Sequence, residues 1–290
     1  MIRAATVAMA LIAASALAEP VMTLEACEAG WSAFTDLSEM PEYLRISGHI
    51  VTPDGWCRMD KTTATLKKND YEVLHWRAVG VLGAIEKNVP PQSLEAIFEG
   101  VLYPSAINPT LPNTSNPGPG TMRLAIFHDP LTQILSLTEA SADFGPMGRF
   151  NLTGQGSGFD FSSDVAMQMA VGGMRLNAAS FKADLTAPLA QVLFSSSIPW
   201  VGKSIELPEL LAMVPETSLA AQDRAALSRF LAALPDATGK LEVSAISENG
   251  FGAVQLGSGA WWYSGPDSLT KAIELWLSGI TIQASWTPAV

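Results

Sequence analysis

Residues 122–161, with the sequence MRLAIFHDPLTQILSLTEASADFGPMGRFNLTGQGSGFDF, decide the fold. Two strand-like runs, Met122 to His128 and Thr132 to Leu137, flank an Asp129-Pro130 turn, and Gly145 to Gly148 marks the next reversal. Short strand-like runs separated by turn residues are typical of consecutive antiparallel strands. The stretch therefore predicts a β-meander, in which each strand pairs with the next one along the chain.

Further strands are predicted downstream. Residues 165–171 alternate Val165, Met167, Met169 and Val171 with small or polar residues, as a half-buried strand requires. The apolar positions of residues 174–185 change parity, which predicts a bulge or bend near Ala179-Ser180. Residues 241–245 lead into Asn249-Gly250, a strong hairpin signal, and the last strand alternates from Ile280 to Trp286.

Two amphipathic helices interrupt these strands. In residues 218–234, Leu227, Phe230, Leu231 and Leu234 share one face, with Thr217 or Ser218 as the expected N-cap. In residues 267–278, Asp267 is the expected cap and Gly279 the stop. Each helix has one apolar stripe, so each should pack against the sheet.

The N-terminal part has the same mixed character. We expect a helix over residues 23–39, strand-like runs over 44–51, 56–66 and 71–79, and a short helix over 94–102. Residues 104–120 are rich in Pro, Asn and Gly and predict a linker or a long surface loop. The expected organisation is an N-terminal α+β lobe (19–103), this segment, and a β-meander lobe (121–290).

Together these patterns predict an α+β fold: a many-stranded, antiparallel, curved sheet with a few amphipathic helices packed on it. In strand rhythm, residues 122–161 resemble the β-meander units of uncharacterised exported proteins of Gram-negative bacteria, in the style of AsmA and LolA-like proteins. That resemblance implies the handling of envelope lipids, and it transfers no site residues.

The N-terminus predicts export. Residues 1–18 contain a positive start at Arg3, an apolar stretch and the small-x-small site Ala16-Leu17-Ala18, so we expect cleavage before Glu19 and a periplasmic location. Acylation at Cys27 is the rival processing route. In an oxidising compartment, Cys27 and Cys57 most simply form a disulfide.

The charge balance excludes one class of partner. The chain has 17 Lys and Arg against 28 Asp and Glu, and loss of Arg3 would leave a net charge of −12. Such a chain repels phosphate backbones, which argues against nucleic acid. Beyond the N-terminal stretch, no segment is long and apolar enough to predict a transmembrane helix.

No catalytic, metal or cofactor signature is found in the sequence. His49, His75 and His128 fall on three different strand candidates without metal-ligand spacing, and no Gly-x-Ser-x-Gly elbow exists. Residues 154–158, Gly-Gln-Gly-Ser-Gly, lack the spacing of a nucleotide-binding loop and predict a turn between strands. We therefore assign no catalytic, cofactor-binding or metal-binding residue.

The remaining candidates are apolar side chains. Met167, Met169 and Trp262 are the predicted ligand-facing residues, since methionine adapts to apolar ligands and Trp262 faces away from its neighbours Trp261 and Tyr263. Core packing explains them equally well. The leading hypothesis is a soluble, non-enzymatic periplasmic protein that binds a partner or an apolar ligand such as an envelope lipid. The alternatives are a hydrolase with an unmarked carboxylate site and an outer-membrane β-barrel.

Overall fold

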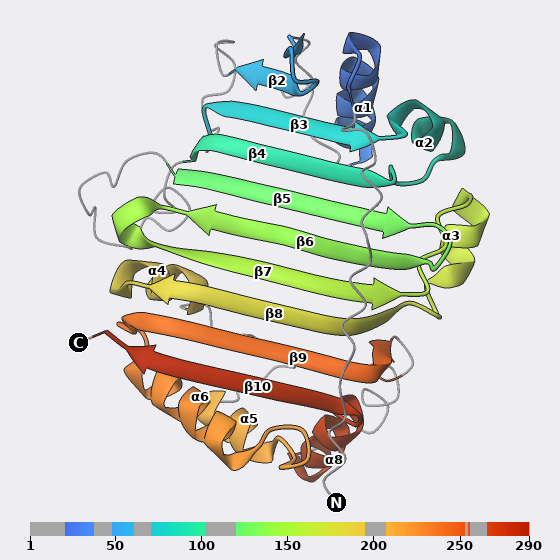
Figure 1. Ribbon diagram of the computed structural model, residues 1–290. Helices are drawn as coiled ribbons and strands as arrows, with labels where there is room; N and C mark the ends of the chain where they lie inside the picture. Colours follow the sequence, from blue (N-terminus) through green and yellow to red (C-terminus); the bar gives the residue numbers. More distant parts are fainter. Residues whose placement is uncertain are drawn as a thin grey trace, which may run out of the picture.

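The computed structural model describes residues 21–37, 48–60, 71–101, 120–194, 207–252, 255 and 266–289. Ten segments in these ranges are strands: β1 (Ile50–Val51), β2 (Cys57–Asp60), β3 (Val73–Val79), β4 (Ser93–Val101), β5 (Gly120–Asp129), β6 (Ile134–Asp143), β7 (Gly148–Ser157), β8 (Arg175–Leu185), β9 (Gly239–Gly252) and β10 (Ile280–Pro288). They form one antiparallel sheet in which every strand pairs with the next one along the chain (Figure 1). The sheet is not closed, and β1 and β10 are its edges. The predicted α+β meander is confirmed.

Most of the helices lie beside the first or the last strands, and one lies at the ends of two central strands (Figure 1). The helices are α1 (Leu24–Leu37), α2 (Val81–Lys87), α3 (Asp164–Ala170), α4 (Ala187–Phe194), α5 (Leu207–Met213), α6 (Ala221–Ala233) and α8 (Pro266–Trp276). Figure 1 places α1 and α2 next to β2–β4, α3 at the ends of β5 and β6, and the other four helices next to β8–β10. No helix in the described ranges is long and apolar enough to cross a membrane.

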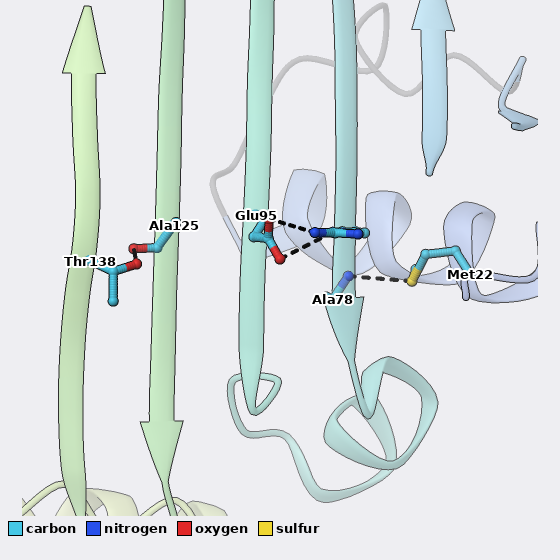
Figure 2. A network of polar contacts seen from close by, with 6 residues as sticks. Met22, Ala78, Glu95, Ala125 and Thr138 are labelled. Carbon is cyan, nitrogen blue, oxygen red and sulfur yellow. Dashed lines mark hydrogen bonds and ion pairs between the residues drawn. The ribbon is translucent and has the colours of Figure 1, made fainter. Parts of the chain in front are cut away.

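The sheet has one apolar and one polar face, as β3 illustrates. Leu74, Trp76 and Ala78 are buried, whereas His75 and Arg77 on the opposite side are partly exposed. We call the side of Trp76 the apolar face and the side of Arg77 the polar face. On the polar face, the Arg77 guanidinium pairs with Glu95 directly opposite on β4, with Nη2 and Oε2 3.0 Å apart (dashed lines at Glu95 in Figure 2).

A disulfide fixes α1 to the apolar face at β2–β4. Cys27 and Cys57 are joined, both fully buried, with their Cα atoms 5.7 Å apart. Trp76 lies opposite Cys57 in the sheet. Beside this cluster, the sulfur of Met22 accepts a hydrogen bond of 3.4 Å from the backbone N–H of Ala78 (Figure 2). The predicted disulfide is confirmed.

Helices α4 and α6 cover the other end of the apolar face. The Phe230 ring of α6 lies 5.2 Å from the Trp286 ring of β10, in an edge-to-face arrangement. Leu189 and Ala190 of α4 are fully buried in the same cluster, which also contains Leu241 of β9. The two helices therefore bury the part of the sheet where β8–β10 lie.

The segment before α6 protects the edge strand. Thr217 or Ser218 as the cap of α6 is wrong: Ala220 is the N-cap and offers no side-chain hydrogen bond. Instead the Ser218 hydroxyl donates to Leu277 O at 2.9 Å, and Ser218 O accepts the N–H of Ile282 at 2.7 Å. Ser218 therefore occupies the N–H of Ile282 on β10, which would otherwise be free to pair with another chain.

The predicted short helix over residues 94–102 is wrong, because this segment is strand β4. Leu94, Ile97 and Phe98 have helical spacing, but Leu94 and Phe98 lie on the apolar face and Ile97 on the polar face. Ile97 is a partly exposed apolar residue between Glu95 and Glu99 on the polar face, and this single exception to the alternation mimics a helical pattern. β4 and β5 are neighbours in the sheet, so residues 102–119 connect two paired strands.

The predicted strand over residues 165–171 is also wrong. Residues 164–170 form α3, whose N-cap Ser163 accepts a hydrogen bond from the N–H of Ala166 at 3.1 Å. The overlooked signal is this capping serine followed by Asp164.

The predicted bulge in β8 is present, but it lies at Asn177 rather than at Ala179-Ser180. Leu176 pairs with Gly156 of β7 and Ala178 with Gln155, so Asn177 is the extra residue of a bulge.

The pairing of β8 with β9 is also irregular at this position, since Leu176 pairs with Phe251 and Ala178 with Ile246. The Asn249-Gly250 hairpin is therefore wrong: residues 247–250 form an irregularity inside β9, where Gly250 has φ 72°. Such bulges bend and twist a sheet.

Some expectations fall outside the described residues. These are the signal peptide (1–18), the Pro-rich residues 104–119 and Trp262. The glycine-rich residues 154–157 are described and belong to β7 rather than to a turn.

A candidate ligand-binding strip on the apolar face

Two rows of residues cross the apolar face from β5 to β10. The first row, defined by direct cross-strand partners, is Leu124, Ala140, Leu152, Phe181, Val243 and Ala284. The second row is Ile126, Leu137, Gly154, Ala179, Ala245 and Ile282. All twelve positions are apolar. We call these two rows the apolar strip.

Among the described residues, the strip is less covered than the row beside it, although Phe181 and Val243 pack against the cluster under α4 and α6. In that neighbouring row, Ala142, Ala183, Leu241 and Trp286 are all buried under α4 and α6. No residue of the strip is buried, and Leu152 is 38% exposed. Large, continuous, partly exposed apolar surface is unusual in a protein unless something binds there.

The shape of the strip comes from its small residues. Gly154, Ala179 and Ala245 stand next to one another on β7, β8 and β9. The larger Leu152 and Phe181 stand beside them in the first row, and Leu137 and Ile282 are their neighbours on either side in the second row. A Cβ added at Gly154 would have only one neighbour within 4 Å, at 3.4 Å, so the residue is not packed against a side chain. The backbone there is accessible to a thin apolar chain.

The strip has the length of an extended lipid chain. Neighbouring strands lie about 4.8 Å apart, so six strands span about 24 Å. Each methylene removed from water contributes about 0.8 kcal/mol. Burial of about ten methylenes would therefore supply roughly the 8 kcal/mol of a micromolar complex, before the entropic cost of binding is subtracted.

The polar face carries a second feature, a hollow of about 750 Å³ over β5–β9. This hollow lies on the side of the sheet opposite the apolar strip. Its lining alternates in charge across the strands: Arg123, Glu139, Asp143, Arg149, Lys182, Asp184, Lys240 and Glu242. A surface with equal numbers of both charges favours hydration rather than one class of ion.

The carboxylates of the hollow already have partners. Asp184 accepts from the Arg149 guanidinium at 2.7 Å, and Asp143 accepts the backbone N–H of Gly145 at 2.7 Å. Glu139 accepts from the Ser141 hydroxyl at 2.7 Å, and Glu242 lies 3.9 Å from Lys182 Nζ. Carboxylates that already have hydrogen-bond or ion-pair partners are typical of a solvated sheet face with balanced charges.

The predicted ligand-facing methionines do not reach the strip. Met167 and Met169 belong to α3, beyond the strand ends, and Met169 is 80% exposed. Trp262 lies outside the described residues. Sequence reasoning missed the strip because each of its rows combines residues from six strands, and only the register places them side by side.

The three histidines lie in different surroundings. His49 is buried between the rings of Trp31 and Trp76, at 5.9 and 6.2 Å. His75 lies on the polar face 3.7 Å from Glu99, and His128 is bonded to Phe159 O at 2.7 Å. Among the described residues, no group of three or more His, Cys, Asp or Glu could hold a metal ion.

Comparison with known proteins places the chain in no family. No family model matches it, and no curated protein and no solved structure shows significant similarity.

Proposed function

We propose that the protein is an exported, non-enzymatic binding protein that holds an extended apolar chain, such as the acyl chain of an envelope lipid, on the apolar strip. The observation that carries the proposal is the pair of rows across β5–β10: twelve apolar residues, none of them buried. The disulfide supports a site of action outside the cytoplasm, because disulfides persist in oxidising compartments.

The difference between the two faces of the sheet supports an apolar ligand on the strip. The charges of the polar face pair across the strands, so it is well solvated without a ligand. The apolar side chains of the strip form no hydrogen bonds with water, and a bound apolar chain would remove them from contact with it. A sheet with one hydrated face and one half-covered apolar face suits a protein that carries a lipid chain through water.

The test is titration of the protein with an environment-sensitive fluorescent fatty acid. We expect saturable binding in the micromolar range. Leu152→Asp places a carboxylate in the middle of the strip and should weaken binding at least about tenfold, because the charge would lose its hydration under the bound chain.

The chain offers a matched control. Ile246 is another large aliphatic residue, 55% exposed, but its cross-strand partners Ala178 and Thr281 place it on the polar face. Ile246→Asp should leave binding within about twofold of the wild type if the ligand lies on the strip. Absence of saturable binding to folded protein, or equal loss in both variants, would refute the proposal.

A further inference from the structure

Large apolar side chains protrude into water at one end of the sheet. They are Leu131 (93% exposed), Val165 (65%), Met169 (80%) and Val171 (56%). Leu131 lies in the turn between β5 and β6, and the others lie in the connection between β7 and β8 that contains α3 (Figure 1). We call these four residues the apolar tip. Helix α3 buries none of its residues, so core packing does not explain its apolar content.

The four residues project from segments 129–133 and 158–174, which we call the platform. The two segments are joined by a hydrogen bond of 3.0 Å from the N–H of Phe159 to Gln133 O. The buried His128 ring bonds to Phe159 O at 2.7 Å and lies 4.7 Å from the Phe161 ring. The two ends of the connection also touch: a Cβ added at Gly158 would lie 2.6 Å from Gly173 O. The exposed side chains are therefore presented by an ordered projection.

The platform is acidic throughout. Asp129, Asp160 and Asp164 are the charged residues of segments 129–133 and 158–174, which contain no Lys or Arg. Each carboxylate is fixed by a local hydrogen bond: Asp129 by Thr132 at 2.7 Å, Asp160 by the N–H of Ser162 at 3.0 Å, and Asp164 by Gln168 at 3.1 Å. Hydrogen bonds from Thr132 and from Ser162 hold the pKa values of Asp129 and Asp160 below the usual range, so both stay charged.

We propose that the apolar tip docks into an apolar pocket of a partner protein whose rim carries Lys or Arg. An apolar centre surrounded by three fixed carboxylates is complementary to such a pocket, and the opposite charges would steer the encounter. Methionine suits the centre because its flexible thioether adapts to an irregular pocket. The inference is independent of the ligand on the strip.

Two other occupants fit the tip less well. An anionic bilayer would be repelled, and surfaces that insert into bilayers typically combine Lys and Arg with Trp or Phe, none of which is exposed on the tip. A second copy would bring two sets of the same carboxylates together.

The test is photo-crosslinking in intact cells that produce the full chain. A photoreactive amino acid replaces Met169 in one variant and Ile50 in the other. Ile50 is 59% exposed on the edge strand β1, at the far end of the sheet, and serves as the control. We expect a protein adduct from position 169 and none from position 50, with the attachment site mapped to apolar residues flanked by Lys or Arg.

Charge reversal completes the test. Asp160→Lys in the position 169 variant should lower the adduct yield about tenfold, because it reverses a charge beside the apolar tip. The variant should still unfold cooperatively on heating, because Asp160 is not buried. Adducts with lipid, adducts with a second copy, no adduct, or an attachment site without basic neighbours would overturn the proposal. So would an adduct yield that Asp160→Lys leaves unchanged.

Discussion

The carboxylate of Asp223 on α6 accepts a hydrogen bond of 2.8 Å from the backbone N–H of Ala284 on the edge strand β10. Asp223 is buried, with 8% of its surface exposed. Its side chain therefore occupies a backbone donor that another strand could otherwise use. Together with Ser218, it ends the sheet at β10.

Replacing Asp223 should expose this edge. We expect Asp223→Ala to lower the free energy of unfolding by about 1–3 kcal/mol, because the partly buried N–H of Ala284 loses its hydrogen-bond partner. The freed edge should also promote association. Urea denaturation and size-exclusion chromatography measure the two effects. Asp223→Asn keeps an acceptor oxygen and should be milder in both; an Ala variant that is as stable and as monodisperse as the wild type would contradict the role.

Removing the disulfide should destabilise the N-terminal part of the sheet. Cys27 and Cys57 are 30 residues apart, and a loop of that length contributes about 3–4 kcal/mol in the chain-entropy model. We expect the Cys27→Ser, Cys57→Ser double variant to lose that amount in chemical denaturation. Intact mass before and after reduction gives an independent check, and two freely alkylated thiols in the unreduced protein would contradict the pairing.

Gly148 should tolerate no side chain. Its φ is 107°, and an added Cβ would lie 2.6 Å from Asp184 O and 2.8 Å from Leu189 Cδ2. We expect Gly148→Ala to cost about 2–4 kcal/mol from backbone strain and overpacking. Gly145 is the matched control, since its φ is also positive, at 58°, but an added Cβ would meet nothing within 4 Å. Gly145→Ala should cost only about 1 kcal/mol in thermal or urea unfolding; equal costs would refute the packing argument.

His49 should make the protein less stable in mild acid. Burial lowers the pKa of His49 below its ordinary value of 6.5, and the nearby carboxylate of Glu28 opposes this more weakly. The unfolded chain therefore binds a proton first as the pH falls through 6.5, and stability decreases from there down to the lower folded-state pKa. Urea denaturation at pH 7.5 and 5.5 measures the difference.

A variant isolates this contribution. Within the described residues, neither imidazole nitrogen of His49 has a hydrogen-bond partner. His49→Leu removes the buried polar atoms and should keep or raise the stability at pH 7.5 while reducing the loss at pH 5.5. If the variant lost as much stability on acidification as the wild type, the dependence would come from other groups.

Much of the fold could be predicted from local patterns. The helix over 23–39, the turn at Asp129-Pro130 and the reversal at Gly145–Gly148 were predictable because capping, spacing and turn residues act within a few positions. The errors at β4 and α3 are opposite in kind. Leu94, Ile97 and Phe98 have helical spacing in a strand that its neighbours in the sheet fix, whereas Val165, Met167 and Met169 alternate in a helix that the local cap Ser163 starts.

The sequence by itself predicted a meander of consecutive antiparallel strands, and in strands without a bulge it determined which residues share a face, because alternation with a period of two is a property of the single strand. Only the tertiary structure decided which residues stand side by side across strands. Thr138 is the extra residue of a bulge in β6 and donates to Ala125 O at 3.1 Å (Figure 2), so Leu137 aligns with Ile126 and Gly154. Such one-residue shifts arise from contacts between strands, and they assemble the apolar strip from six separate segments.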